Sequence, residues 1–300
     1  MFPTVKQRVI IATGILIGAG LFAMGKELLM ATDAGSGISL ISSRVGPTIA
    51  TGLIAGIGLP VLAMGIFSSS SGHPLSGIFL ISTSLFILAG SIEGWLFRSS
   101  SAAGSELPQR YVALIVETTL WQIGVLATIF AIHISRKKLR ALLPIAATSS
   151  HLGDDTNFKL PRGLSLASGL ACAMISALLG LILLKDNNAV QIMAGLFIAF
   201  SLGSLVTQLI LPTNTNPVPL LLSPALVAIT TYAYVQFKFQ SADEFYAAMW
   251  TSRLPGLALA LPIHYVSAGV AGVALGIGWA QGLITNQTRP QNAKASSNTG

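Results

Sequence analysis

The chain has 300 residues, of which 52% are hydrophobic and only 9% are charged, and its formal net charge is +7. Soluble domains carry about 25% charged residues, so this composition excludes a soluble globular fold of the same size. The Lys and Arg residues lie between apolar runs, which is the pattern that orients a membrane protein and not the footprint of a nucleic-acid-binding protein. We therefore expect an integral membrane protein whose partner is the lipid bilayer, with no nucleic acid as a partner.

Apolar runs of the length that spans a bilayer recur along the chain. A spanning helix needs about 20 mostly apolar residues. Runs near or above this length are 9–25, 47–67, 75–97, 111–134, 163–184, 189–211, 218–237 and 254–285. The last run is long enough to tilt or to contain a break near Pro262. Because period-two alternation is absent, the sequence predicts an all-α polytopic fold of about eight transmembrane helices, with residues 1–285 forming a single bundle.

The first apolar run has two interpretations. Lys6 and Arg8 precede it, and the small-residue sequence ATDA follows at 31–34. That order is typical of a secretory signal peptide with its cleavage site. Lys26 and Glu27 interrupt the approach to the site, which favours an uncleaved first helix. The sequence leaves both interpretations open.

The connector 135–162 is the most basic part of the chain. Its basic residues are Arg136, Lys137, Lys138, Arg140, Lys159 and Arg162. Loops rich in Lys and Arg stay in the cytoplasm, so this connector is expected to be cytoplasmic. With four helices before it and four after it, both termini share its side of the cell (inner or cytoplasmic) membrane. The polar tail 286–300 is expected to be disordered.

Glycines four residues apart mark several of the expected helices. Lipid tails are as apolar as leucine, so membrane helices associate through small residues that let their backbones approach closely. The pairs are Gly14 with Gly18, Gly52 with Gly56, Gly90 with Gly94, and Gly272 with Gly276. We predict tight helix packing at each pair, and we single out Gly272 and Gly276 in the last helix.

A few ionisable and amide side chains fall inside the apolar runs. A charge in hydrocarbon costs about 2.5–3.5 kcal/mol on insertion scales, so it usually has a partner or a function. Glu117 in the fourth run and His264 in the eighth have similar inferred depths, in the outer half of the bundle. We predict that both face the interior and meet in a common cavity. The supporting polar residues are Glu93, Arg253, Gln191 and Gln208.

Three short segments resemble conserved blocks of the PrsW-type intramembrane metalloproteases. LPIHYVSAGVAGVALG, preceded by Arg253, is similar to the block with an arginine, a histidine and a glycine-rich helix. ALIVETTLWQ is similar to the glutamate-bearing helix, and GLFIAFSLGSLVTQ to the small-residue helix. Family carboxylates are partly missing: Thr118 follows Glu117 where the family has a second glutamate, and Gln208 ends a block where the family has a glutamate and an asparagine.

The resemblance implies a membrane-embedded metallopeptidase that cuts peptide or protein substrates in the membrane. Glu117 and His264 would then be the catalytic residues and ligands of a Zn²⁺ ion, which activates a water molecule in such enzymes. A catalytic Zn²⁺ takes three protein ligands, and the sequence shows no clear third one. An active peptidase, an inactive relative, a non-enzymatic scaffold or assembly protein, and a small-solute or proton-coupled transporter all stay open. No cofactor is certain.

Overall fold

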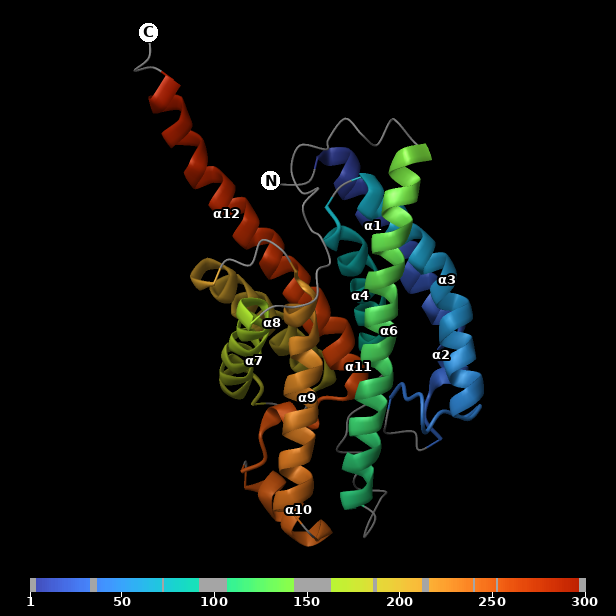
Figure 1. Cartoon of the computed structure of the whole chain (residues 1–300). Helices are drawn as coiled ribbons and strands as arrows, with labels where there is room; N and C mark the ends of the chain where they lie inside the picture. Colours follow the sequence, from blue (N-terminus) through green and yellow to red (C-terminus); the bar gives the residue numbers. More distant parts are fainter. Residues whose placement is uncertain are drawn as a thin grey trace.

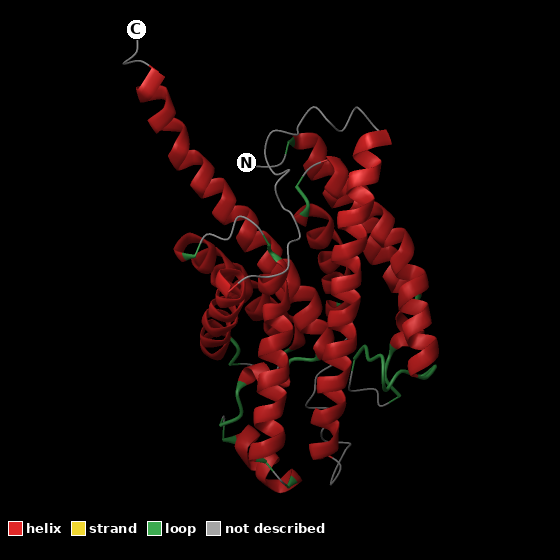
Figure 2. Ribbon diagram, in the orientation of Figure 1, coloured by secondary structure: helices red, strands yellow, loops and turns green. Residues whose placement is uncertain are grey.

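The computed structural model describes residues 4–32, 37–71, 73–91, 107–142, 163–185, 188–211, 216–239, 241–251 and 253–296. Figure 2 shows that this part of the chain consists of helices joined by loops. The described residues contain no strand, although two isolated β-bridges lie in the segment between α2 (Lys26–Leu29) and α3 (Pro47–Ser71). The protein is therefore an all-α, polytopic helical protein, as predicted from the sequence.

Seven helices in the described residues are long and apolar enough to cross a membrane, and each coincides with one of the apolar runs. These helices are α1 (Val5–Met24), α3, α6 (Leu107–Leu142), α7 (Gly163–Leu183), α8 (Ala189–Ile210), α9 (Val218–Lys238) and the last helix, which includes α12 (Val270–Ser296). A shorter apolar helix, α4 (Leu75–Gly90), coincides with the remaining run. Every expected apolar run thus forms a helix over most of its described length.

The helices pack side by side in one bundle (Figure 1). Helix α1 packs against α3 and α4, α6 packs against α3 and α9, and α12 packs against α8 and α4. The start of α1, the end of α6 and the end of α12 all lie toward the upper end of the view in Figure 1. The short helix α10 (Ala242–Trp250) lies at the opposite end.

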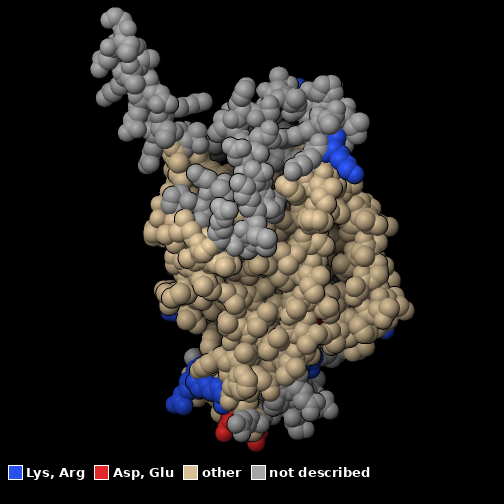
Figure 3. Space-filling view, viewed as in Figure 1, with Lys and Arg blue, Asp and Glu red and all other residues tan. Residues whose placement is uncertain are grey.

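Large apolar side chains cover the outside of the helices. Leu16 is 71% exposed, Phe130 is 65% exposed and Met174 is 67% exposed. On the face drawn in Figure 3, the charged side chains of the described residues lie mainly toward the two ends, with a broad uncharged region between them. Soluble monomers rarely expose apolar patches larger than a few hundred Å². This surface therefore faces lipid, and the protein is a multi-pass membrane protein.

Gly272 and Gly276 lie where α12 crosses α8. A Cβ atom added at Gly272 would lie 2.5 Å from the carbonyl oxygen of Phe197. One added at Gly276 would overlap the hydroxyl of Ser204, which donates a 3.3 Å hydrogen bond to the carbonyl oxygen of Val273 across the interface. Only glycine lets the two backbones approach this closely.

Helix α1 meets α4 through another glycine pair. A Cβ atom at Gly14 would overlap the side chain of Leu80, and one at Gly18 would lie 2.5 Å from the hydroxyl oxygen of Ser84. Both contacts involve side chains of α4, so this pair permits the close packing that the sequence predicts.

The pair Gly52 and Gly56 does not behave this way. A Cβ atom at either position would have nothing within 4 Å, and both residues are exposed on α3. The prediction of tight packing at this pair is wrong, because the spacing of two glycines does not say which face of a helix is covered. In the remaining pair, a Cβ atom at Gly90 would lie 3.9 Å from the side chain of Met193, which is an ordinary contact. Gly94 falls outside the described residues.

Two expected boundaries differ from the structure. Helix α6 continues to Leu142, so the first part of the connector 135–162 is helical, and residues 143–162 lie outside the described part. Helix α12 continues to Ser296. The tail expected to be disordered from residue 286 is therefore helical over most of its length, and only its last four residues lie outside the described part.

The last apolar run is not one continuous helix. Its first part forms a 3₁₀ turn, η3 (Gly256–Leu259), and the backbone is extended at Ala260. Regular helix begins at α11 (Pro262–His264), as the sequence allows for a break near Pro262, and a π-helical turn, η4 (Tyr265–Gly269), leads into α12. Nearly all residues from Leu257 to Ile277 are buried. Non-helical backbone at membrane depth is tolerated where protein surrounds it or where it lines a cavity.

Candidate functional site

Glu117 occupies the buried face of α6, where it is 3% exposed. Its carboxylate accepts three hydrogen bonds. The hydroxyl of Ser39 donates to Oε2 at 2.8 Å, and the backbone N–H of Leu40 donates to Oε1 at 2.8 Å. The indole N–H of Trp121, one turn along α6, also donates to Oε1 at 3.4 Å. Both oxygens are thus engaged by donors from the protein.

The segment that contacts Glu117 connects α2 to α3 and is not helical. Isolated β-bridges join Met30 to Ile38 and Ala31 to Ser43, and Gly37 turns the chain with a φ of 63°. Residues 38–40 of this segment are buried. A backbone N–H buried in a membrane protein needs a protein acceptor, because lipid offers none. Glu117 provides that acceptor.

His264 is 2% exposed and ends α11. The backbone N–H of Leu261 donates to its Nδ1 at 3.2 Å, so the imidazole closes the turn at which the helix begins. In a neutral imidazole only one nitrogen accepts, which leaves the proton on Nε2. The side chain therefore caps the start of the last helix.

Glu117 and His264 are both buried, so their predicted interior placement is confirmed. Helix α11 also packs against α6. No hydrogen bond or ion pair between described residues joins the two side chains; each one contacts a different stretch of irregular backbone. Their meeting in a common cavity remains a prediction.

Three buried tyrosines surround the irregular start of the last run, and each donates its hydroxyl proton to a backbone carbonyl oxygen there. The pairs are Tyr111 with Ala258, Tyr232 with Ala260, and Tyr265 with Leu257. The rings of Tyr111 and Tyr232 lie 5.9 Å apart, and those of Tyr232 and Tyr265 lie 6.2 Å apart. These residues satisfy carbonyl groups that a regular helix would have satisfied itself.

The sequence did not single out this tyrosine cluster. Tyr232 and Tyr265 stand inside apolar runs, which is a signal of a buried hydrogen bond, because a tyrosine hydroxyl in a membrane interior needs a partner. Tyr111 stands at the start of its run, where an interfacial position is an equally good interpretation.

The supporting polar residues do not gather at Glu117 and His264. Gln208 is buried, but it lies on α8, whereas Gln191 and Arg253 are exposed. Glu93 lies outside the described residues. A different amide is buried on α6: both side-chain polar atoms of Gln122 lack a hydrogen-bond partner among the described residues.

A zinc centre does not fit the part of the chain that the structure describes. No group of three or more His, Cys, Asp or Glu side chains comes together there. Both oxygens of Glu117 and Nδ1 of His264 already accept hydrogen bonds from the protein. A catalytic Zn²⁺ needs three protein ligands and an open position for water.

No family model, no curated protein and no solved structure matches this chain. The resemblance of three short segments to the PrsW-type enzymes therefore stays a hypothesis.

Proposed function

We propose that this protein is a non-enzymatic membrane scaffold or assembly protein, in which Glu117 and His264 hold irregular backbone inside the helical bundle. The observation that carries the proposal is the bonding of Glu117. One of its oxygens accepts a hydrogen bond from the hydroxyl of Ser39, and the other accepts one from the backbone N–H of Leu40. A general base has to reach a water molecule or substrate. The Glu117 side chain is buried, and its hydrogen bonds instead hold the connection between α2 and α3.

His264 supports the same proposal. Its Nδ1 accepts from the backbone of Leu261, at the point where the last run changes from extended chain to helix. The tyrosine cluster fixes the preceding carbonyl groups. Polar groups that each serve a specific stretch of backbone make the arrangement rigid, which suits a protein that presents fixed surfaces to lipid or to membrane partners.

Transport of a small polar solute or of protons is the second candidate. It is favoured by the buried amide of Gln122, which has no partner among the described residues, and by the interrupted last helix. Discontinuous helices provide solute and ion sites in many transporters. A peptidase is a third candidate, favoured only by the sequence resemblance, and it would need ligands from residues outside the described part.

The first test replaces His264 by glutamine and by leucine. Glutamine keeps an acceptor near the Leu261 N–H, whereas leucine leaves that buried donor unsatisfied at a cost of about 1–3 kcal/mol. We expect the melting temperature in detergent to fall more for leucine than for glutamine. We also expect the amount of bound metal per protein to be the same for wild type and glutamine variant.

Two outcomes would contradict the proposal. One metal ion per chain in the wild type and none in the His264→Gln variant, at unchanged melting temperature, would favour a metallopeptidase, and cleavage of a membrane peptide by the wild type alone would support it. Proton uptake into proteoliposomes that disappears in the same variant, again at unchanged stability, would favour transport.

We also propose that the protein lies in the cell membrane with both termini and the connector 135–162 in the cytoplasm. The basic cluster of that connector supports this orientation. A location-sensitive reporter fused after residue 150 or after residue 300 should give a cytoplasmic signal. A fusion after residue 252, between α10 and η3, is the control and should give the opposite signal. A periplasmic signal at residue 150 or 300 would show that the orientation is reversed or that the number of spans is odd.

A further inference from the structure

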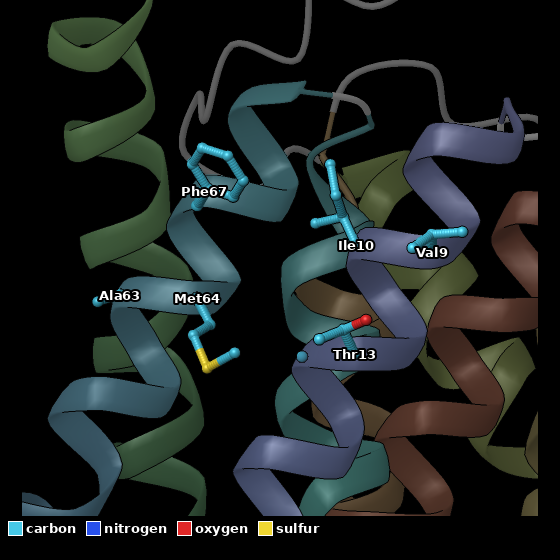
Figure 4. A pocket seen from close by; sticks show the side chains of 7 residues that line it. Val9, Ile10, Thr13, Ala63, Met64 and Phe67 are labelled. Atoms are coloured by element: carbon cyan, nitrogen blue, oxygen red, sulfur yellow. The ribbon is translucent and has the colours of Figure 1, made fainter.

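Helices α1 and α3 touch at one end and separate toward the other. A Cβ atom at Gly25 would lie 2.6 Å from the Ile57 side chain, and one at Gly18 would lie 3.2 Å from Val61. Nearer the start of α1 the two helices leave a groove of about 390 Å³ between them. The groove is lined by Val9, Ile10, Thr13 and Gly14 of α1 and by Ala63, Met64 and Phe67 of α3. In Figure 4, Ile10 of α1 and Met64 of α3 point toward the gap between the two helices.

The groove is apolar and opens toward lipid. Thr13 supplies the one hydroxyl among its lining side chains. Val9 is 58% exposed and Phe67 is 51% exposed, so the rims lie on the outer surface of the bundle. Ala63 contributes only a methyl group to the lining. An apolar groove open to the bilayer fits an acyl chain.

A lysine lies on the same face of α1, next to the groove. A spacing of i, i+3, i+4 and i+7 places residues along one stripe of a helix. The residues with this spacing on α1 are Lys6, Val9, Ile10 and Thr13. Lys6 is exposed and has no hydrogen bond or ion pair with another described residue. Helical side chains lean toward the N-terminus, and lysine extends its ammonium toward the membrane surface. The charge therefore belongs beyond the open end of the groove, at headgroup level.

We propose that the groove between α1 and α3 is a binding site for an anionic phospholipid, with an acyl chain along the groove and the headgroup phosphate bound by Lys6. An apolar channel that begins at a membrane surface suits an acyl chain. A lysine without a hydrogen-bond or ion-pair partner among the described residues suits the phosphate above it. Basic residues near the ends of membrane helices attract anionic headgroups by about 1 kcal/mol each. The site does not depend on the function proposed above.

The charge is tested by substituting Lys6 and by a matched control. The full-length protein is delipidated in detergent and titrated with phosphatidylglycerol or phosphatidylcholine of identical acyl chains, and the first bound lipid is measured by native mass spectrometry. We expect the wild type to prefer phosphatidylglycerol. Lys6→Gln should weaken phosphatidylglycerol binding about fivefold and leave phosphatidylcholine binding unchanged. Arg8→Gln removes the same charge from the opposite side of α1 and should leave both unchanged.

The groove itself is tested by filling it. Ala63→Phe adds a ring to the lining of the groove and should weaken binding of both lipids. Ala55→Phe, at another exposed alanine of α3 outside the groove, should not. Melting temperatures of the four variants establish that each is folded. Equal affinity of the wild type for the two lipids, equal losses in Lys6→Gln and Arg8→Gln, or unchanged binding by Ala63→Phe would each overturn the proposal.

Discussion

Replacing Gly276 by leucine is expected to destabilise the bundle strongly. The first carbon of the new side chain would overlap Ser204 and the carbonyl oxygen of Ser201, so α12 could remain helical only by moving away from α8. Overpacking a tightly packed interior costs about 1–3 kcal/mol and sometimes more. A clash with backbone atoms should cost an amount near the upper end of this range, because a carbonyl group cannot turn aside as a flexible side chain can. Gly272→Leu should have a similar effect through Phe197.

The matched control is Gly278→Leu on the same helix. Gly278 is exposed, and a Cβ atom there would have nothing within 4 Å. Thermal unfolding in detergent, followed by the loss of the monodisperse peak on size exclusion, measures all three variants. We expect Gly278→Leu to melt near the wild type. If Gly276→Leu also melted near the wild-type temperature, α8 and α12 would not be in contact at this glycine.

The helices were predictable because a membrane leaves few alternatives. An apolar run of about 20 residues cannot satisfy its backbone groups in lipid unless it forms a helix, so composition and length determine the structure of most of the chain. The prediction was less accurate where protein replaces lipid as the solvent. The part of the last run before Pro262 is as apolar as a spanning helix, but its carbonyl groups bind tyrosine hydroxyls instead. Helix α10 was missed because its nine residues are too few to span a bilayer.

The candidate site was also predictable only in part. The burial of Glu117 and His264 was predictable from the cost of exposing either group to hydrocarbon. Their partners were not, because Ser39 and Leu40 lie far from Glu117 in the sequence and belong to a segment without a periodic pattern. Glycine spacing has the same limit: Gly52 and Gly56 match Gly272 and Gly276 in the sequence, yet the first pair faces outward. Which face of a helix is covered depends on the neighbouring helices.

Removing the carboxylate of Glu117 should release the segment between α2 and α3 from the bundle. Glu117→Leu leaves the N–H of Leu40 without its acceptor in a buried position, at a cost of about 1–3 kcal/mol. The hydroxyl of Ser39 and the indole of Trp121 lose the same partner, which adds to the loss unless they turn to others. Glu117→Gln keeps one acceptor oxygen but points an N–H₂ group at a donor. We therefore expect stability to decrease from wild type to glutamine to leucine.

Hydrogen exchange locates the effect. The amide of Leu40 should exchange much faster in Glu117→Leu than in the wild type, while amides in the middle of α8 stay protected. Thr119→Val on the exposed side of α6 removes a polar group two residues away, where the hydroxyl donates to the carbonyl oxygen of Ile115 in its own helix. This control should change neither stability nor exchange at Leu40. Unchanged exchange at Leu40 in Glu117→Leu would mean that the carboxylate does not hold this segment and that Glu117 has no structural role there.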